Sequence, residues 1–196
     1  RYCDAAEVSV FTPRSETGLP IDVLGSLRCP PGAILEDADA LGDQVQSTSA
    51  ALLGLIGIEA DPLTGPETVF IQSLLQHLWL QRKDLTLAEL IRFLGQPPFD
   101  KIGAMDVESF FPEKARRALM LSFNALLASP SFALWSRGTP LDIDQLLYNE
   151  DGKPRLAVLS IAHLSEPERM FFVTLLLSSV LTWIRRQSGT TALRAI

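Results

Sequence analysis

The chain has 196 residues, of which 47% are hydrophobic and 20% are charged, and its formal net charge is −6. This length and apolar content allow one domain, or a compact domain with a smaller lobe, and exclude a disordered or fibrous chain. The negative charge argues against nucleic-acid binding by the surface as a whole.

The first two thirds of the chain predict one strand followed by helices. The β-branched and aromatic run 8–12 predicts a strand, and the glycines and prolines of 14–32 predict an irregular segment. Apolar residues then recur at spacings of three and four, which is typical of helices. Prolines and a Thr86–Glu89 capping box mark the starts of some of these helices. These patterns predict four helices, over 34–58, 66–82, 86–95 and 112–128.

The character of the sequence changes after residue 150. Residues 156–161 form a continuous apolar run, typical of a parallel strand buried on both faces. Ser165 and Glu168 predict a second capping box, which opens a helix over 166–187. This helix is apolar nearly all round, but its apolar part is shorter than the ~20 residues that cross a bilayer. We therefore expect it to lie between a sheet and other protein, with no membrane span. The run 192–196 predicts the start of another strand.

The expected fold is mainly α with a small α/β part. We expect a strand and irregular lead-in over 1–32, a helical insertion subdomain over 33–150, and a β-α-β segment over 151–196 whose second strand is incomplete. Because natural domains rarely stop inside such a unit, we expect an excised piece of a larger protein. No basic-then-apolar leader is visible, so the expected location is the cytoplasm.

Charge is unevenly distributed along the chain. Residues 1–63 hold ten acidic and three basic residues, a net charge of −7, whereas residues 153–196 hold two acidic and six basic residues, a net charge of +4. This difference in charge between the two ends could orient the chain against a neighbouring protein or a polyanion. The alternative is that the chain has two solvated faces of opposite charge.

No catalytic signature is complete in the sequence. A GxxxxGK[ST] phosphate loop is absent, no apolar run ends in an Asp-Glu pair, and neither GxSxG nor HExxH occurs. The two histidines and two cysteines lack metal-site spacing, and Asp37 and Asp39 open a calcium-like loop that lacks its twelfth-position glutamate. We expect no catalytic, cofactor-binding or metal-ligating residue in this chain.

Five residues remain as candidates for an interface or for phosphate contacts. His163 lies between the apolar run and the capped helix, where ligands gather in open parallel sheets, although a loop or capping role is the alternative. Tight arginine pairs suit phosphate, either as a finger in a neighbour's site or against nucleic acid. Their alternative is a solvent-facing or ion-paired position on a helix. These pairs are Arg116 with Arg117, and Arg185 with Arg186.

Several longer strings point to a family. They are FTP at 11–13, GLPI at 18–21, SPSF at 129–132, PLDID at 140–144, KPRLAVLSIAHLS at 153–165, ERMFFV at 168–173 and RRQSG at 185–189. Together they resemble the region before the Walker B strand of bacterial HerA-like ATPases, in the HerA/FtsK group of P-loop DNA-translocating motors. The resemblance covers nearly the whole chain.

The resemblance implies a Walker A loop upstream of Arg1 and a Walker B strand begun by 192–196, with its acidic pair past Ile196. For the parent protein it implies ATP and Mg²⁺ as cofactors, a homo-oligomeric and commonly hexameric ring, and association with DNA. Both nucleotide motifs are missing here, so no catalytic residue is carried over.

Two hypotheses follow. In the first, the chain is the helical insertion and part of the sheet of a HerA-like ATPase, with the rest of that domain as its partner. The chain alone is then expected to be inactive, to bind nucleotide weakly or not at all, and to bind DNA only weakly. In the second, it is a non-enzymatic helical protein-interaction module whose acidic first half docks a partner.

Overall fold

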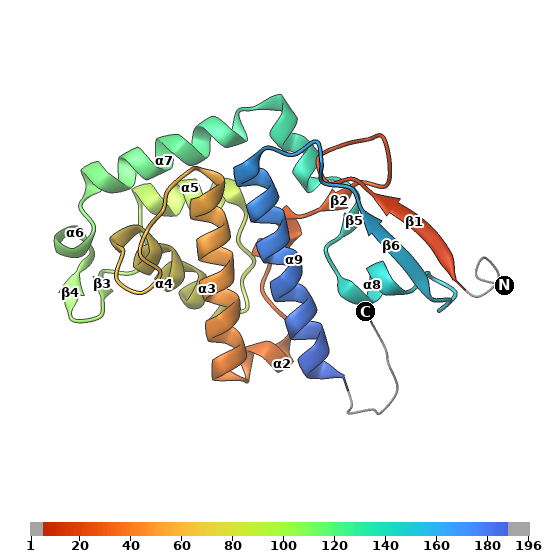
Figure 1. Cartoon of the computed structure of the whole chain (residues 1–196). Coiled ribbons are helices and arrows are strands. Elements are labelled where there is room, and N and C mark those ends of the chain that lie inside the picture. Colours follow the sequence, from red (N-terminus) through yellow and green to blue (C-terminus); the bar gives the residue numbers. More distant parts are fainter. Residues whose placement is uncertain (1–5, 188–196) are drawn as a thin grey trace.

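The computed structural model describes residues 6–187 and shows a mainly α fold with a small α/β part (Figure 1). The strands are β1 (Glu7–Phe11), β2 (Ile21–Asp22), β3 (Lys101–Ile102), β4 (Met105–Asp106), β5 (Thr139–Pro140) and β6 (Arg155–Leu159). The helices are η1 (Leu24–Leu27), α2 (Gly32–Leu35), α3 (Ala38–Leu55), α4 (Pro66–Leu80), α5 (Leu87–Gly95), α6 (Val107–Phe110), α7 (Glu113–Leu127), η2 (Pro130–Ser136), α8 (Ile143–Leu147) and α9 (Glu166–Arg186). The predicted fold class is confirmed.

Two strands far apart in the sequence form a parallel pair. β1 pairs with β6 in register from Glu7 opposite Arg155 to Phe11 opposite Leu159. A shorter parallel pair, β2 with β5, lies next to it, and β3 with β4 forms a small antiparallel hairpin. Figure 1 shows the β1–β6 sheet at one end of the molecule and α4, α5 and α6 at the other.

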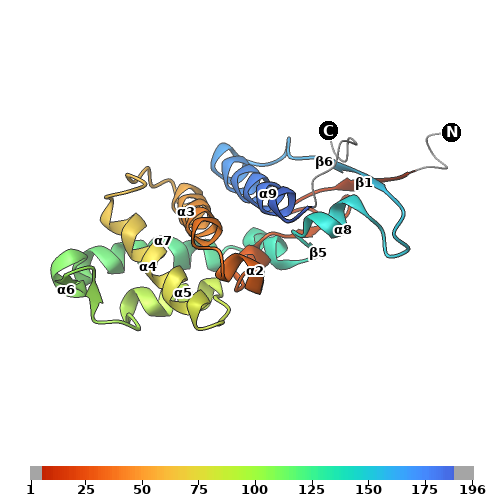
Figure 2. The same ribbon diagram turned by 90° about the horizontal axis from the view of Figure 1, so that it is seen from below.

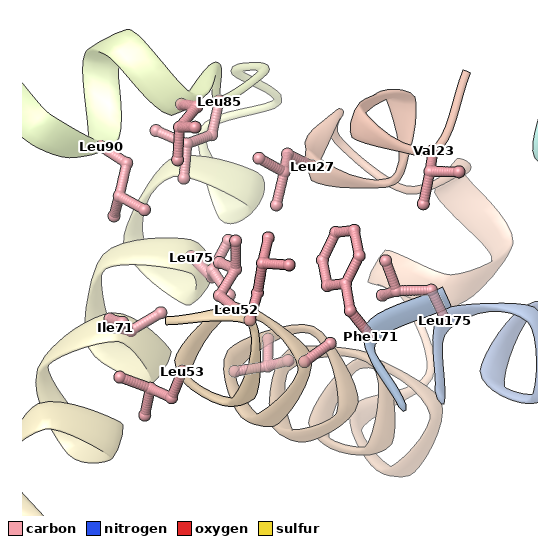
Figure 3. Packing of buried hydrophobic residues seen from close by; sticks show 14 of the residues in the cluster. Val23, Leu27, Leu52, Leu53, Ile71, Leu75, Leu85, Leu90, Phe171 and Leu175 are labelled. Carbon is pink, nitrogen blue, oxygen red and sulfur yellow. The ribbon is translucent and has the colours of Figure 1, made fainter. Parts of the chain in front are cut away.

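One apolar core joins the helices to the sheet side of the molecule. Leu52 and Leu53 of α3 face Ile71 and Leu75 of α4 on one side, and α9 contributes Phe171 on the other (Figure 3). Buried positions on α4 recur at spacings of three and four because that spacing places them on one side of a helix. The helices α3 and α9 lie side by side in both ribbon views (Figures 1 and 2).

The helix predicted over 34–58 is two helices. Asp37 has an extended backbone (φ −105°, ψ 107°), and its side chain accepts hydrogen bonds from the backbone N–H groups of Asp39 and Ala40. It is therefore the N-cap of α3, and α2 ends before it. The other three predicted helices of this region are present with ends shifted by at most two residues, and the capping box of Thr86 with Glu89 is confirmed.

The strand expected to be buried on both faces is covered on only one by residues 6–187. Leu156 and Val158 of β6 are 58% and 43% exposed, while Ala157 and Leu159 pack against the core. The helix α9 also differs from the expectation, because it buries one side only and leaves Leu177 exposed on the other. The cause is the same in both cases, since no described element lies over these surfaces. The strand predicted at 192–196 lies outside the described residues.

Candidate functional site

The carboxyl ends of β1 and β6 meet at one edge of the molecule, as the sequence predicted for His163. The Nε2–H of His163 donates to the carbonyl oxygen of Pro13, just after β1, at 2.7 Å. The backbone N–H of Ser160 donates to the carbonyl oxygen of Phe11 at 2.9 Å and extends the strand pairing. His163 thus lies at the predicted edge, but its ring is hydrogen-bonded to the chain's own backbone and not to a ligand.

Arg14 and Glu168 link the loop after β1 to the start of α9. Arg14 has φ 58°, which is uncommon for a residue other than glycine, and its guanidinium pairs with the Glu168 carboxylate. The same carboxylate accepts from the backbone N–H and the hydroxyl of Ser165, at 2.9 and 2.7 Å. The predicted capping box is therefore confirmed and tied to the sheet edge by an ion pair.

Glu168 predicts a defined acid dependence of stability. Burial opposes its ionisation, but the hydrogen bonds of Ser165 and the charge of Arg14 outweigh burial and hold the pKa of Glu168 below its usual 4.5. A lowered folded-state pKa stabilises the fold above the unfolded-state pKa, and this contribution disappears as pH falls through the folded value. We expect Glu168→Gln to cost about 1 kcal/mol at pH 7 and to flatten the loss of stability below pH 4.5.

Urea unfolding at several pH values measures this effect, with Glu166→Gln as the matched control. The side chain of Glu166 is 72% exposed and, among residues 6–187, pairs with Arg169, so its replacement should change stability in acid less than Glu168→Gln does. An equal change in the two variants would contradict the role given to Glu168.

The four candidate arginines do not come together. Arg116 is buried on α7 and Arg117 is exposed beside it, whereas Arg185 and Arg186 lie in the last turn of α9. Arg116 donates to two backbone carbonyl groups and pairs with Glu108, so it is committed to the fold. These arginines form no joint phosphate site.

Some acidic residues from the first part of the sequence form ion pairs with basic residues from its last part. Arg185 pairs with Asp43 of α3 at 2.8 Å, and Arg155 of β6 pairs with Glu7 of β1 at 3.5 Å. The basic end of the described chain thus packs against the acidic first part. Solvent reaches both ion pairs, so each contributes little to the free energy of unfolding. Their main effect is on how the two segments are oriented.

An apolar surface covers one face of the parallel sheet. Val8 lies opposite Leu156, and Val10 opposite Val158, and these four side chains are 43–61% exposed. The alternate residues point the other way, where Ser9 and Phe11 are buried. Figure 2 shows α8 and β5 on one side of β1 and β6, and no helix or strand of residues 6–187 over the other side. We name Val8, Val10, Leu156 and Val158 the outer apolar face.

The helix α9 adds a second apolar surface. Its exposed residues recur at helical spacing and form one stripe, composed of Met170, Leu177, Leu181 and Ile184. Judged by length and composition alone, α9 is the one helix within residues 6–187 that is apolar enough to cross a membrane. This is a weak sign of a span, because α9 also buries Phe171, Phe172 and Leu175 in the core.

Side chains that could bind a metal ion do not gather in the part of the chain that the structure describes. Within residues 6–187, no three His, Cys, Asp or Glu side chains lie together as metal ligands. Burial raises the pKa of the Cys29 thiol, with the charge of Asp84 acting in the same direction, so the thiol is protonated at neutral pH. His77 is half-buried and hydrogen-bonded to Gln81.

Comparisons of the chain with protein-family models, with curated proteins and with solved structures found no match. The outer apolar face is the leading candidate site. The sequence indicated an apolar strand at β6, but it did not place β1 beside it, although the alternation of Val8, Ser9 and Val10 is typical of a strand with two different faces.

Proposed function

We propose that the chain supplies the helical insertion and two neighbouring core strands of a HerA-like P-loop ATPase. The observation that supports this most is the parallel, in-register pairing of β1 with β6. If an insertion separates two adjacent strands of an ATPase core, the chain should contain four elements in order. These are a strand, a long helical insertion, a second strand parallel to the first, and a returning helix. The resemblance of the strings described above points the same way.

The outer apolar face supports the same proposal. Parallel sheets occur almost only with both faces covered, because their crossover helices lie on the faces. Here α8 covers one face, and Val8, Val10, Leu156 and Val158 remain exposed on the other. We infer that the remainder of the ATPase domain covers this face in the parent protein. The outer edge of β6, which pairs only with β1 among the described strands, offers it a position for a further strand.

In this proposal the chain contributes scaffold, and the parent protein contributes the nucleotide chemistry. ATP and Mg²⁺ would be held by a phosphate loop and by an acidic strand end, neither of which occurs in this sequence. A homo-oligomeric ring, contact with DNA and a cytoplasmic location belong to the parent in the same way. Arg117 and Arg186 are the exposed candidates that remain for a contact with a neighbour.

The coding sequence on either side of the chain tests the proposal. We expect a GxxxxGK[ST] loop encoded upstream, and four apolar residues followed by Asp-Glu directly downstream of Ile196. If both motifs are absent, the proposal is wrong. The outer apolar face would then favour the second hypothesis, a protein-interaction module, although one that docks through its sheet and not through its acidic half.

A double substitution tests whether the outer apolar face is an interface. We expect the 196-residue chain to self-associate as its concentration rises, because an uncovered apolar face drives association. Val8→Lys combined with Leu156→Glu should abolish this association. The two residues lie opposite each other, so the opposite charges keep the strands compatible.

Sedimentation velocity over a range of concentrations measures the association. The matched control is Leu63→Lys combined with Leu121→Glu, which adds the same two charges at leucines that are 77% and 60% exposed and lie outside the sheet. If this control reduces association as strongly as the double substitution in the sheet, the effect comes from added surface charges and the outer apolar face is not the interface.

A further inference from the structure

A groove of about 500 Å³ lies between α3 and α4, in the helical part of the molecule. Its lining side chains come from the first half of α3, from the connection between the two helices and from the middle of α4, within 38–46, 62–63 and 72–76. That connection lies beside α3 in both ribbon views (Figures 1 and 2). The volume falls in the range of about 300–1,000 Å³ that ligand pockets occupy. We name it the α3–α4 groove.

The α3–α4 groove has an apolar floor and an apolar rim. Leu41 and Val45 are one helical turn apart on α3 and form the floor, at 5% and 7% exposed. Leu63 lies at the rim and is 77% exposed. The carboxylate of Asp61 fixes this part of the chain, because it accepts from the backbone N–H groups of Leu63 and Thr64 at 2.9 and 2.7 Å. The groove therefore offers apolar contacts on two sides to an apolar side chain of a ligand.

Among the described residues, the charged side chains that line the groove are all acidic. They are Asp39 and Asp43, which lie on the same side of α3 because they are four residues apart. Asp43 pairs with Arg185 at 2.8 Å, and Arg185 does not line the groove. The carboxylate of Asp39 makes no ion pair and accepts no hydrogen bond within residues 6–187. One negative charge thus remains uncompensated at the groove, which favours a cationic group and disfavours an anion.

Three glutamine side chains add hydrogen-bonding groups that match a peptide backbone. Gln72 and Gln76 are one turn apart on α4, and Gln46 lines the groove from α3. The amide N–H of Gln72 donates to the carbonyl oxygen of Pro62 at 3.3 Å, so its own carbonyl oxygen stays available. An amide side chain both donates and accepts, as a peptide group does. A simple organic cation lacks the groups that would use these amides, whereas a peptide has them at every residue.

We propose that the α3–α4 groove binds a short peptide segment of another protein, in which a lysine or arginine lies next to an apolar residue. The apolar side chain packs against Val45 and Leu63, and the cationic side chain pairs with Asp39. Asp39 and Val45 are six residues apart in one helix, or about 9 Å along its axis, which adjacent side chains of a peptide span. The groove is separate from the outer apolar face, and the proposal does not rest on the ATPase function.

An NMR titration of the 196-residue protein with capped pentapeptides tests the proposal. The probe has the sequence Leu-Lys-Leu-Lys-Leu, and we expect it to bind saturably. Replacing both lysines by glutamine should weaken binding about fivefold, because the ion pair with Asp39 is lost. Replacing the three leucines by serine should weaken it at least tenfold, because the apolar contacts are lost. No saturable binding, or equal binding of the lysine and glutamine peptides, would overturn the proposal.

Butylammonium separates a peptide ligand from a small cation, because it carries the charge and a short apolar chain without peptide groups. We expect it to bind at least tenfold more weakly than the lysine pentapeptide. Equal binding of the two would assign the groove to a small amine and overturn the peptide proposal.

Gly42→Leu blocks the groove, with Gly54→Leu as the matched control. Both glycines lie in α3, and a Cβ atom at either position meets no atom within 4 Å, so leucine fits at both. Leucine also favours a helix more than glycine does, so both variants should fold. Gly42 lines the groove and Gly54 does not. We expect Gly42→Leu to weaken the lysine pentapeptide at least tenfold and Gly54→Leu to leave its binding unchanged. Equal weakening by the two variants would overturn the site.

Asp39→Asn tests the charge, with Glu113→Gln as the matched control. Each is an exposed acid in the first turn of a helix, so both variants lose the same interaction with a helix dipole. Asp39→Asn should weaken the lysine peptide about threefold and leave the glutamine peptide unchanged, whereas Glu113→Gln should change neither. Equal effects of the two variants would show a general charge effect and overturn the proposal. Self-association of the chain that Gly42→Leu removes would identify a second copy as the occupant, which also overturns it.

Discussion

Replacing Arg116 with methionine is expected to lower the free energy of unfolding by about 3 kcal/mol. The Arg116 Nε–H donates to the carbonyl oxygen of Leu94 at 3.1 Å, and Nη1 donates to that of Phe111 at 2.6 Å. These carbonyl groups lie at the ends of α5 and α6, where a helix supplies no backbone donor. Methionine keeps the apolar stem but leaves both carbonyl groups buried without a partner.

Arg117→Met is the matched control for this prediction, and urea unfolding measures both variants. Arg117 is the next residue of α7 and is exposed, so we expect a change within about 0.5 kcal/mol. If the two variants are destabilised alike, the loss comes from charge or helix propensity, and the buried hydrogen bonds of Arg116 do not hold the corner between α5 and α7.

The second large effect is expected for Phe171→Ala, at about 3–5 kcal/mol. Phe171 is 1% exposed, and its ring meets that of Trp135 edge-on with the centroids 5.4 Å apart. Figure 3 shows it between Leu52 of α3 and Leu175 of α9. Its removal leaves a cavity at the junction of the helical part with the sheet part, where few other side chains can fill the space.

Met170→Ala is the control, because Met170 precedes Phe171 in α9 and is 55% exposed. We expect Met170→Ala to cost less than about 1 kcal/mol in the same urea experiment. A large loss for Met170 in the isolated chain would show that the exposed stripe of α9 is already covered, for example by a second copy.

Much of the fold was predictable from local signals. The strand β1, the two capping boxes and the helices α4, α5, α7 and α9 follow from residue spacing and from start and stop residues. The break between α2 and α3 was missed because Asp37 also fits the first turn of a helix, and only its extended backbone shows that it is a cap. The pairing of β1 with β6 joins the two ends of the described chain, and nothing in either strand alone specifies its partner.

The site was predictable only in part. His163 lies at the sheet edge as expected, because the order of strand, loop and capped helix places it there. The fate of Arg116 and Arg117 was not predictable, since neighbouring residues on a helix point in directions about 100° apart and only the packing of α5 decides which one is buried. The apolar run of β6 indicated two buried faces, but Leu156 and Val158 are exposed among residues 6–187, because local sequence does not show which face neighbouring elements cover.

ATP hydrolysis by the full-length gene product tests whether β1, β6 and α9 belong to the core of a HerA-like ATPase. We expect Mg²⁺-dependent hydrolysis by the complete protein, loss of hydrolysis when the lysine of its phosphate loop is changed to alanine, and no hydrolysis by the 196-residue chain alone. A complete protein that has no phosphate loop, or that hydrolyses no ATP, would contradict the assignment of β1, β6 and α9 to an ATPase core.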